Sequence, residues 1–472
     1  MGHFLLYQIL PLAALWLALV WLARAPYFDR WGHAAIFLAG AALQSALWLA
    51  SRPTLENADS LGFFRLAHGA ETDLRAWLYR PKLYPWFLAS FPSGPSLASL
   101  KTATFCQCVL KLAMGGCLLR FARLCAWKPS TTALLLFLFL FGSLWLSAPL
   151  FIFDTTLFAF LFAVFLLLAA EVRAHYSAPK FAAMCLAAGL TTLTRQVADL
   201  ALLAVLTLTA IAVLRQGAGA GIGGRRLFLA VGFSLLAGLV VGGAGAAVNG
   251  IRQGVWVRSV ALGVNAYTHA AYYQLHDPRT PEWEFVEAAL PGARGELPAW
   301  ETGFAHAIPW EAIALPHRLE RELGSADVRE ILAGDRLLRD RALRWALGKP
   351  ASYLASFANE LSRLLGKCEE LYPDSLIDPH ARGPLFLRRA EAGAIYQPPW
   401  LLLAAGLAAL ILGRRNRPLL LIPALAALAY LAPIAALQMG FTRYALPALL
   451  PLLLMAGEAV DRIPSPFPSD PA

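Results

Sequence analysis

Long runs of apolar residues separated by short basic stretches constrain this chain more than any other feature. A helix needs roughly 20 apolar residues to cross a bilayer, and about eleven stretches approach that length. They are residues 4–23, 33–51, 98–119, 131–149, 153–171, 181–194, 196–214, 227–248, 399–413, 418–437 and 443–459. Charged residues make up only 15% of the chain and hydrophobic residues 58%, whereas about 25% are charged in a soluble protein. We therefore predict an all-α membrane protein, a polytopic helical bundle with about eleven transmembrane helices.

The basic residues of the short loops divide the bundle into two sides. Lys and Arg are enriched in cytoplasmic loops. If Arg414, Arg415 and Arg417 are cytoplasmic, alternation of the spans brings the basic residues of the earlier short loops to the same side. The opposite, outer side then collects five pieces: the loop 52–97, the turn 149–154, the turn near Arg195, the segment 250–398 and the turn 438–443.

Four parts follow from this pattern. The N-terminal transmembrane module is 1–249, and its first outer loop, 52–97, carries candidate catalytic residues. The segment 250–398 is the longest polar region, and its apolar residues recur at helical spacing after Asp327 and again after Pro350. We expect it to form a small, mainly helical outer domain. Residues 399–463 form the C-terminal transmembrane helices, and 464–472 form a disordered tail.

Two acidic residues at the outer ends of spans are the candidate catalytic groups. Asp59 follows the second span, and Asp154 directly precedes an apolar run. A carboxylate beside hydrocarbon is costly and points to function, and it serves as a general base when its pKa is suitably tuned. The structural alternative is that either acid is a helix cap, with Gly69 as the stop of the helix that Asp59 begins.

Basic residues on the same side are candidate phosphate ligands. Arg80 and Lys82 stand within a Pro-rich aromatic stretch that also holds Tyr84. Arg195 and Arg443 lie at the outer ends of later spans. Arginine holds phosphate in a bidentate fork and lysine as a point charge. The structural alternative is that these bases and aromatic residues anchor the helices at the interface.

Other chemistries are disfavoured. The histidines lack HExxH spacing, and there is no G-x-S-x-G, Walker or Cys-x-x-Cys pattern. We assign no metal ligands, and we choose His269 as the histidine to test for a substrate contact. The net charge of +10 is scattered between the spans, so the predicted partners include membrane lipids and no nucleic acid.

Five of these stretches, taken in order, resemble the motifs of the GT-C superfamily of integral-membrane glycosyltransferases. The most similar members are bacterial relatives of the protein O-mannosyltransferases and of the lipid A aminoarabinose transferases. The stretches are Asp59–Ala67, Tyr79–Pro85, Pro149–Asp154, Gly189–Arg195 and Arg443–Pro447. The chain departs from the pattern in having one acid in the first loop where many members have an adjacent pair, and Tyr79 where aminoarabinose transferases carry an acid.

The resemblance implies a transferase that moves a sugar from a polyprenyl-phosphate donor to a glycan, lipid or protein acceptor. It implies an inverting single displacement at the extracytoplasmic face of a bacterial inner membrane. Asp59 is then the general base, and Asp154 orients the acceptor or binds a divalent cation, the possible cofactor. Arg80, Lys82, Arg443 and Arg195 are expected to bind the donor phosphate. Tyr84, Tyr444 and His269 are expected to contact substrate.

Two other classes remain open at this point. A secondary transporter or lipid flippase also has many spans with interfacial acids and arginines, but it places broken helices and ionisable residues near the bilayer midplane in two repeats. A non-catalytic membrane scaffold requires that Asp59 and Asp154 lie far apart.

Overall fold

The structure, a computed structural model, describes residues 28–51, 58–71, 74–91, 97–219, 224–274, 327–366, 399–412, 417–437 and 442–462, together with Pro53 and Leu55. Every regular element that it describes is a helix, which confirms the predicted class. The predicted first span, 4–23, the tail 464–472, and most of the segment 275–398 lie outside these residues. The division of the chain into four parts stays a prediction.

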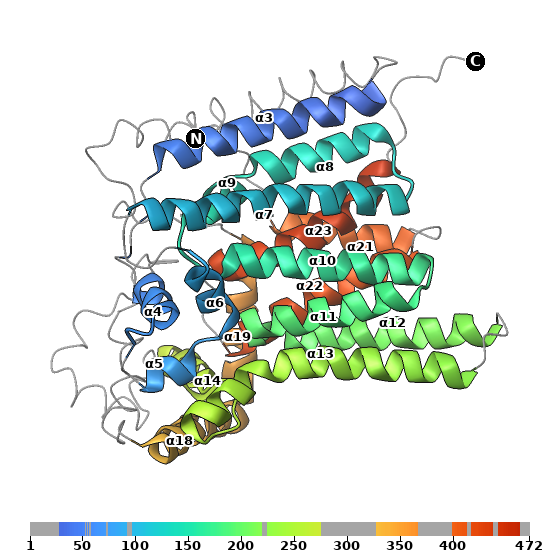
Figure 1. The fold of residues 1–472 in the computed structure, drawn as a ribbon. Helices are drawn as coiled ribbons and strands as arrows, with labels where there is room; N and C mark the ends of the chain where they lie inside the picture. The colour runs from blue at the N-terminus through green and yellow to red at the C-terminus, as the bar shows by residue number, and fades with distance from the viewer. Residues whose placement is uncertain are drawn as a thin grey trace, which may run out of the picture.

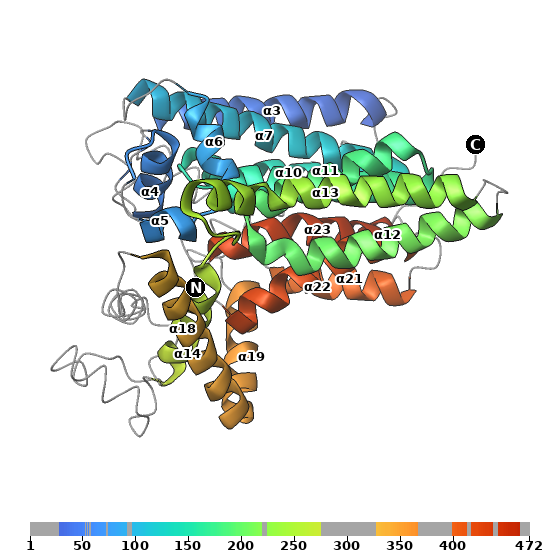
Figure 2. The ribbon, with the colours of Figure 1, turned by 60° about the horizontal axis from the view of Figure 1, so that its bottom comes forward.

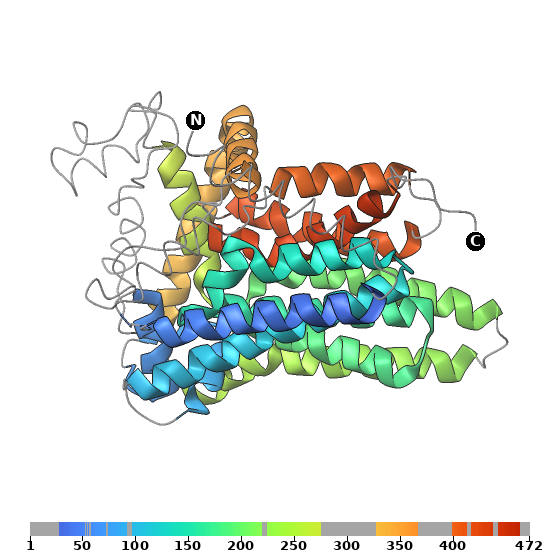
Figure 3. The ribbon, with the colours of Figure 1, turned by 90° about the horizontal axis from the view of Figure 1, so that it is seen from above.

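A bundle of roughly parallel and antiparallel helices forms the body of the molecule (Figure 1). Its members are α3 (Phe28–Ala50), α7 (Leu97–Leu124), α8 (Pro129–Phe141), α10 (Thr155–Ala174), α11 (Ala178–Thr194), α12 (Asp199–Gly219), α13 (Gly224–Gln253), α21 (Pro399–Leu412), α22 (Arg417–Leu437) and α23 (Thr442–Asp461). Seen from above, α3 lies on the outside of the bundle, where it packs on α7 and α8 (Figure 3). The core is made by large apolar side chains of α8 and α10 packed on those of α22 and α23.

Six helices of the described part are long and apolar enough to cross a membrane. This shows an integral membrane protein, while the count of about eleven spans stays a prediction. The stretch 181–214 forms two helices, α11 and α12, which are separated at Arg195 by the 3-10 turn η3 (Gln196–Ala198). Arg195 has an extended backbone, with φ −153° and ψ 121°. The chain therefore turns back at the residue predicted to lie at an outer end.

The predicted span 131–149 is broken. Helix α8 ends at Phe141, Gly142 is extended, and α9 (Ser143–Ser147) and the 3-10 helix η2 (Ala148–Leu150) follow. A break leaves carbonyl groups without helical partners, which is tolerated inside a membrane only if other groups satisfy them. Lys111 Nζ donates to the Leu140 carbonyl at 2.9 Å and to Gln44 Oε1 at 2.7 Å, and Gln44 Nε2 donates to the Leu146 carbonyl at 3.2 Å. Two polar residues from α7 and α3 thus bridge the break.

Short helices and a hairpin of two longer helices gather at one end of the bundle. These are α4 (Ala58–Ala67), α5 (Leu74–Tyr79), α6 (Leu83–Ala89), α14 (Ala261–Gln274), α18 (Val328–Gly348) and α19 (Pro350–Gly366). Figures 1 and 2 show all of them at the same end, together with the start of α10 and the end of α11. The described parts of the segments that were predicted to share the outer side of the bundle therefore lie at the same end. That this end faces outward stays a prediction.

Helices α11 and α13 approach each other closely at glycines. A Cβ on Gly189 would come within 2.5 Å of the Gly238 carbonyl oxygen, and a Cβ on Gly238 within 2.6 Å of the Cys185 carbonyl oxygen. Small residues let membrane helices pack backbone to backbone. We expect Gly189→Ala to destabilise the fold by about 1–3 kcal/mol, since backbone atoms must shift. The measurement is the unfolding midpoint of the purified protein.

Gly232→Ala, on the same helix α13, is the matched control. A Cβ there meets no atom of the described residues within 4 Å, and alanine favours a helix. Equal loss of stability in both variants would contradict the α11–α13 contact as the cause, because helix propensity alone favours alanine at both positions.

Candidate functional site

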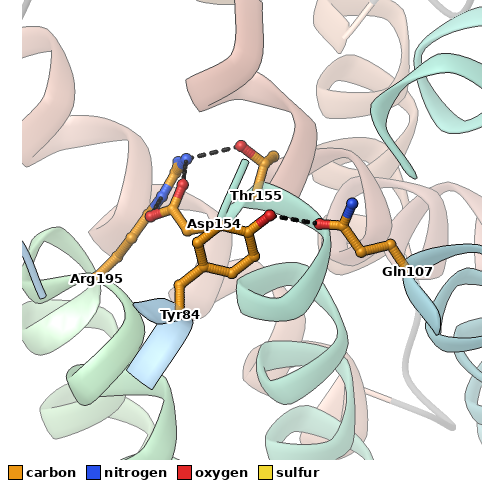
Figure 4. A network of polar contacts seen from close by, with 5 residues as sticks. All are labelled: Tyr84, Gln107, Asp154, Thr155 and Arg195. Carbon is orange, nitrogen blue, oxygen red and sulfur yellow. Dashed lines mark hydrogen bonds and ion pairs between the residues drawn. The ribbon is translucent and has the colours of Figure 1, made fainter. Parts of the chain in front are cut away.

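A buried ion pair joins two turns of the chain at one end of the bundle. Asp154 ends the turn that precedes α10, and Arg195 lies in the turn that follows α11. Arg195 Nε donates to Asp154 Oδ2 at 2.8 Å, and Arg195 Nη2 donates to Asp154 Oδ1 at 2.6 Å. Arg195 Nη2 also donates to the Thr155 hydroxyl at 2.7 Å (Figure 4). The side chains of the pair are only 8% and 9% exposed. A bidentate geometry of this kind fixes the carboxylate in one orientation and balances its charge in a site of low polarity.

Asp154 occupies the N-cap position of α10, but its side chain makes no capping hydrogen bond. The cap interpretation is therefore right about the position of Asp154, but the carboxylate does not cap the helix. Its carboxylate is turned to Arg195, a contact between residues 41 positions apart that no local sequence pattern predicts. The phosphate-binding role of Arg195 and the catalytic role of Asp154 both stay predictions.

Tyr84 and Gln107 connect this ion pair to the first loop. The Tyr84 hydroxyl donates to Gln107 Oε1 at 3.2 Å (Figure 4), and Gln107 Nε2 donates to the carbonyls of Pro149 and Phe151 at 3.1 and 2.6 Å. Burial, and secondly the charge of Asp154, raise the pKa of Tyr84 well above its usual value. Tyr84 is fully buried and supports the segment that presents Asp154. Its predicted contact with substrate stays a prediction.

The helix that carries Asp59 is fixed in place by the same tyrosine. Phe63, on α4, meets Tyr84 edge to face, with ring centroids 5.1 Å apart. Helix α4 ends as predicted at Gly69, which has φ +69°. Gly69 N–H donates to the Leu66 carbonyl and Ala70 N–H to the Arg65 carbonyl, the pattern of a Schellman cap. Asp59 lies in the first turn of α4, but its side chain is outside the described residues.

Arg80 rests on the same helix. Its guanidinium lies over the Phe63 ring, 4.8 Å from the centroid. A Cβ on Gly62 would approach that guanidinium to 2.6 Å, so a larger residue at this position would displace the Arg80 side chain from its present place on α4. The structure thus brings Arg80 together with the helix of Asp59, as the sequence predicted for the first loop.

Lys82 belongs to a cluster of two cations around Trp77. Lys82 Nζ lies 4.4 Å from the centroid of the Trp77 ring and donates to the Trp77 carbonyl, and Arg252 Cζ lies 4.9 Å from the same ring. The ring is oriented by its Nε1, which donates to Asn249 Oδ1 at 3.1 Å. Lys82 is 3% exposed. Burial, and then the charge of Arg252, lower the pKa of Lys82 to about 7.

Neither cation of this cluster forms an ion pair with a described residue. Two like charges that are held together without a carboxylate repel one another, so the arrangement favours a bound anion. Sequence reasoning found Lys82 but missed Arg252, because Arg252 was counted with the outer segment 250–398. It also missed Gln107, for which the signal was a polar residue inside an apolar span.

His269 lies in a different cluster. It is buried on α14, with Nε2 3.1 Å from the Ser356 hydroxyl, and its ring stands edge-on to Trp345 and Tyr353. Its role as a substrate contact stays a prediction. Arg443 and Tyr444 are in the first turn of α23, but their side chains lie outside the described residues.

The described residues contain no group of three His, Cys, Asp or Glu side chains placed to hold a metal ion. Both carboxylate oxygens of Asp154 accept hydrogen bonds from Arg195. A divalent cation at Asp154 would have to displace the guanidinium. The Asp154 site as it stands therefore fits an arginine and not a metal.

No protein-family model matches the chain, and no curated protein is detectably similar to it. The fold is similar to the crystal structure of ArnT from Cupriavidus metallidurans bound to undecaprenyl phosphate. The identity is 15%, the match covers 91% of this chain and 78% of ArnT, and the TM-score is 0.35. At this identity and TM-score the likeness is loose and adds no weight to a functional assignment.

Proposed function

We propose that the protein is a membrane glycosyltransferase that uses a polyprenyl-phosphate sugar donor. One observation carries the proposal: at a single end of the bundle, a fixed buried carboxylate and a pair of cations that has no ion-pair partner among the described residues are joined through one short helix, α6. Lys82 precedes this helix and Tyr84 lies in it. Transfer from a lipid phosphate needs two sets of groups. Carboxylates orient the acceptor and take the proton of its hydroxyl group, and cations stabilise the phosphate that leaves.

The cation cluster supplies the second set of groups. When the sugar departs, the lipid phosphate gains negative charge, and fixed cations in a partly dry site stabilise this charge more strongly than water does. Lys82 and Arg252 flank Trp77, whose ring is held by Asn249, so the two charges are placed in advance. Arg80 and Arg443 are the further phosphate ligands that the family resemblance implies. We also propose that the acceptor is a glycan, lipid or protein and that transfer takes place at the extracytoplasmic face of the membrane.

The acids supply the first set of groups. In an inverting single displacement, a general base removes the proton of the acceptor hydroxyl as its oxygen attacks the anomeric carbon, and the bond to the phosphate oxygen breaks. We assign the base to Asp59. Asp154, held by Arg195, is a fixed negative charge that orients the acceptor. Arg195 is then a positioning residue, which acts through Asp154.

A transporter or flippase is the competing class. It requires ionisable groups near the midplane that change partners during transport. Lys111 is buried near the middle of α7, but its hydrogen bonds go to Gln44 and to the carbonyl group at the break after α8. These are structural contacts, and the remaining site residues lie at one end of the bundle. The geometry therefore favours the transferase.

The test is the loss of a modification. Cells that lack the protein are compared with the parent by mass spectrometry of glycans, glycolipids and glycoproteins, and membranes with the protein are given radiolabelled polyprenyl-phosphate sugars. A sugar missing from one acceptor class, restored by the parent chain, is expected. Movement of intact donor lipid between leaflets, with no transfer to any acceptor, would instead identify a flippase.

The affinity for polyprenyl phosphate should fall as pH rises above about 7. The pKa of Lys82 in the unliganded protein is about 7, so above that pH the lysine is increasingly neutral and must take up a proton to bind the anion. The loss is up to about tenfold per pH unit, because one proton is taken up. Below about pH 7, Lys82 is already protonated, so a further decrease in pH does not raise the affinity through this residue. Titration of binding by quenching of tryptophan fluorescence measures the effect.

Lys82→Arg is the matched variant, since arginine stays charged throughout this range. It should bind with an affinity that depends on pH only through the ionisation of the lipid phosphate itself. An equal decline in the parent and in Lys82→Arg would remove Lys82 from the phosphate site.

A further inference from the structure

Helices α18 and α19 form a hairpin that runs across the axis of the bundle. Figures 2 and 3 show both helices crossing the direction of the bundle helices at the end where the short helices gather, and in Figure 2 the turn between them projects below the end of α22. The two helices are joined at Lys349. If the bundle helices stand upright in a bilayer, this hairpin lies roughly parallel to the membrane plane and reaches sideways over the lipid.

A hydrogen bond fixes the depth of the hairpin. The Tyr353 hydroxyl donates to the Ala436 carbonyl at 3.1 Å. Ala436 is in the last turn of α22, which is one of the helices long and apolar enough to cross a membrane. The beginning of α19 is therefore held at the level where α22 leaves the hydrocarbon. Tyrosine is enriched at this level in membrane proteins.

Large apolar side chains are exposed on both sides of the turn. Leu343 is 55%, Leu347 73% and Leu354 64% exposed. Leu343 and Leu347 are four residues apart and share one face of α18. The opposite face, with Ile331, Leu338 and Trp345, is buried. The hairpin thus packs with one side of α18 and leaves a separate apolar surface at the turn.

Arginines surround this surface. Helix α18 carries five arginines against three acidic residues. Arg336 and Arg339 lie seven and four residues before Leu343 and so on the same face, and Arg344 lies beside that face. All three are exposed. One of the acids, Asp335, is engaged by the Gly263 N–H at 2.7 Å. Another, Asp340, lies 3.8 Å from Arg339, so the outer face keeps an excess of positive charge. We call the surface made by Arg336, Arg339, Leu343, Arg344, Leu347 and Leu354 the α18–α19 corner.

We propose that the α18–α19 corner docks on anionic phospholipid headgroups of the same bilayer. The three leucines enter the boundary between headgroups and acyl chains, and the arginines contact lipid phosphates. Amphipathic helices that lie in the interface have this combination of apolar residues and a basic face, and charge complementarity favours anionic over zwitterionic lipid. The contact needs a chain that spans a membrane, but it does not depend on the transfer chemistry.

The test places a photoreactive residue at the corner. The full chain is made with benzoylphenylalanine at position 347 or, as the control, at position 333. Ala333 is also exposed on α18 but lies towards the other end of that helix. Each protein is reconstituted in nanodiscs of phosphatidylcholine with or without phosphatidylglycerol, irradiated, and analysed by mass spectrometry for the adducts.

Position 347 is expected to give phospholipid adducts and position 333 few or none. In the mixed discs the adducts should favour phosphatidylglycerol by about fivefold for each arginine in contact. Arg336→Gln, Arg339→Gln and Arg344→Gln together should bring that preference close to the ratio of the lipids supplied. If the variant without these arginines fails to fold, the ratio of phosphatidylglycerol to phosphatidylcholine adducts at position 347 of the otherwise unchanged protein still tests the proposal.

Equal and low lipid yields at positions 347 and 333 would overturn the proposal. So would lipid adducts without any preference for phosphatidylglycerol, which would show a purely apolar contact. Adducts to a protein, in membranes of the source cells, in place of lipid would show that the corner binds a protein partner.

Discussion

Arg195→Met is expected to destabilise the protein by about 3–5 kcal/mol, because it leaves the buried Asp154 carboxylate without its partner. Asp154→Asn should destabilise it for the complementary reason, since the guanidinium is then unpaired. The double variant, with Asp154→Asn and Arg195→Met, removes both charges and should regain most of the loss. The unfolding midpoints of the four proteins, followed by tryptophan fluorescence in one detergent, form a double-mutant cycle that isolates the pair.

Transfer activity separates the structural and the functional role of the pair. If Asp154 orients the acceptor, the stable double variant still transfers little sugar, and its KM for the acceptor rises more than kcat falls. If the pair only joins the two turns of the chain, activity returns together with stability. A single Arg195→Met variant as stable as the parent would contradict the ion pair itself.

A more exposed ion pair at the same end of the bundle serves as the control. Arg258 Nη2 lies 2.5 Å from Asp199 Oδ2, and the side chains are 42% and 33% exposed. Exposed pairs contribute about 0–1 kcal/mol. Arg258→Met should therefore change the unfolding midpoint far less than Arg195→Met does, although both substitutions remove an arginine from a carboxylate.

Asp59→Asn is expected to lower the rate of sugar transfer by about 10²–10⁴-fold, the usual contribution of a general base. The fold should be retained, because α4 is held by Phe63 against Tyr84 and is closed by Gly69, and neither contact uses the carboxylate. The measurement is the initial rate with a matched donor in membranes, together with the affinity for polyprenyl phosphate, which should not change.

Asp59→Glu restores the acid one methylene farther out and should recover part of the rate. Asp340→Asn, at an exposed position of α18, should leave transfer unchanged. Unaltered transfer in Asp59→Asn would show that another group removes the proton.

Local chemistry explains why parts of this fold were predictable. Gly69 ends α4 because glycine adopts a positive φ without a steric penalty. Arg195 ends α11 where charge interrupts an apolar run. The break after α8 falls at Gly142 and Ser143, a type of pair at which helices kink, but this local signal does not specify how the freed carbonyl groups are satisfied. That depends on Lys111 and Gln44, which reach the break from two other helices.

The sequence by itself determined that this is an all-helical membrane protein and gathered its charged residues at the ends of spans, because apolar length and charge act along the chain. Only the tertiary structure decided their partners. It turned Asp154 to Arg195, set Lys82 beside Arg252 around Trp77, and tied Tyr84 to Gln107. Each contact joins different helices, and the energy of a buried charge depends on groups a few ångströms away in space, which the order of residues does not specify.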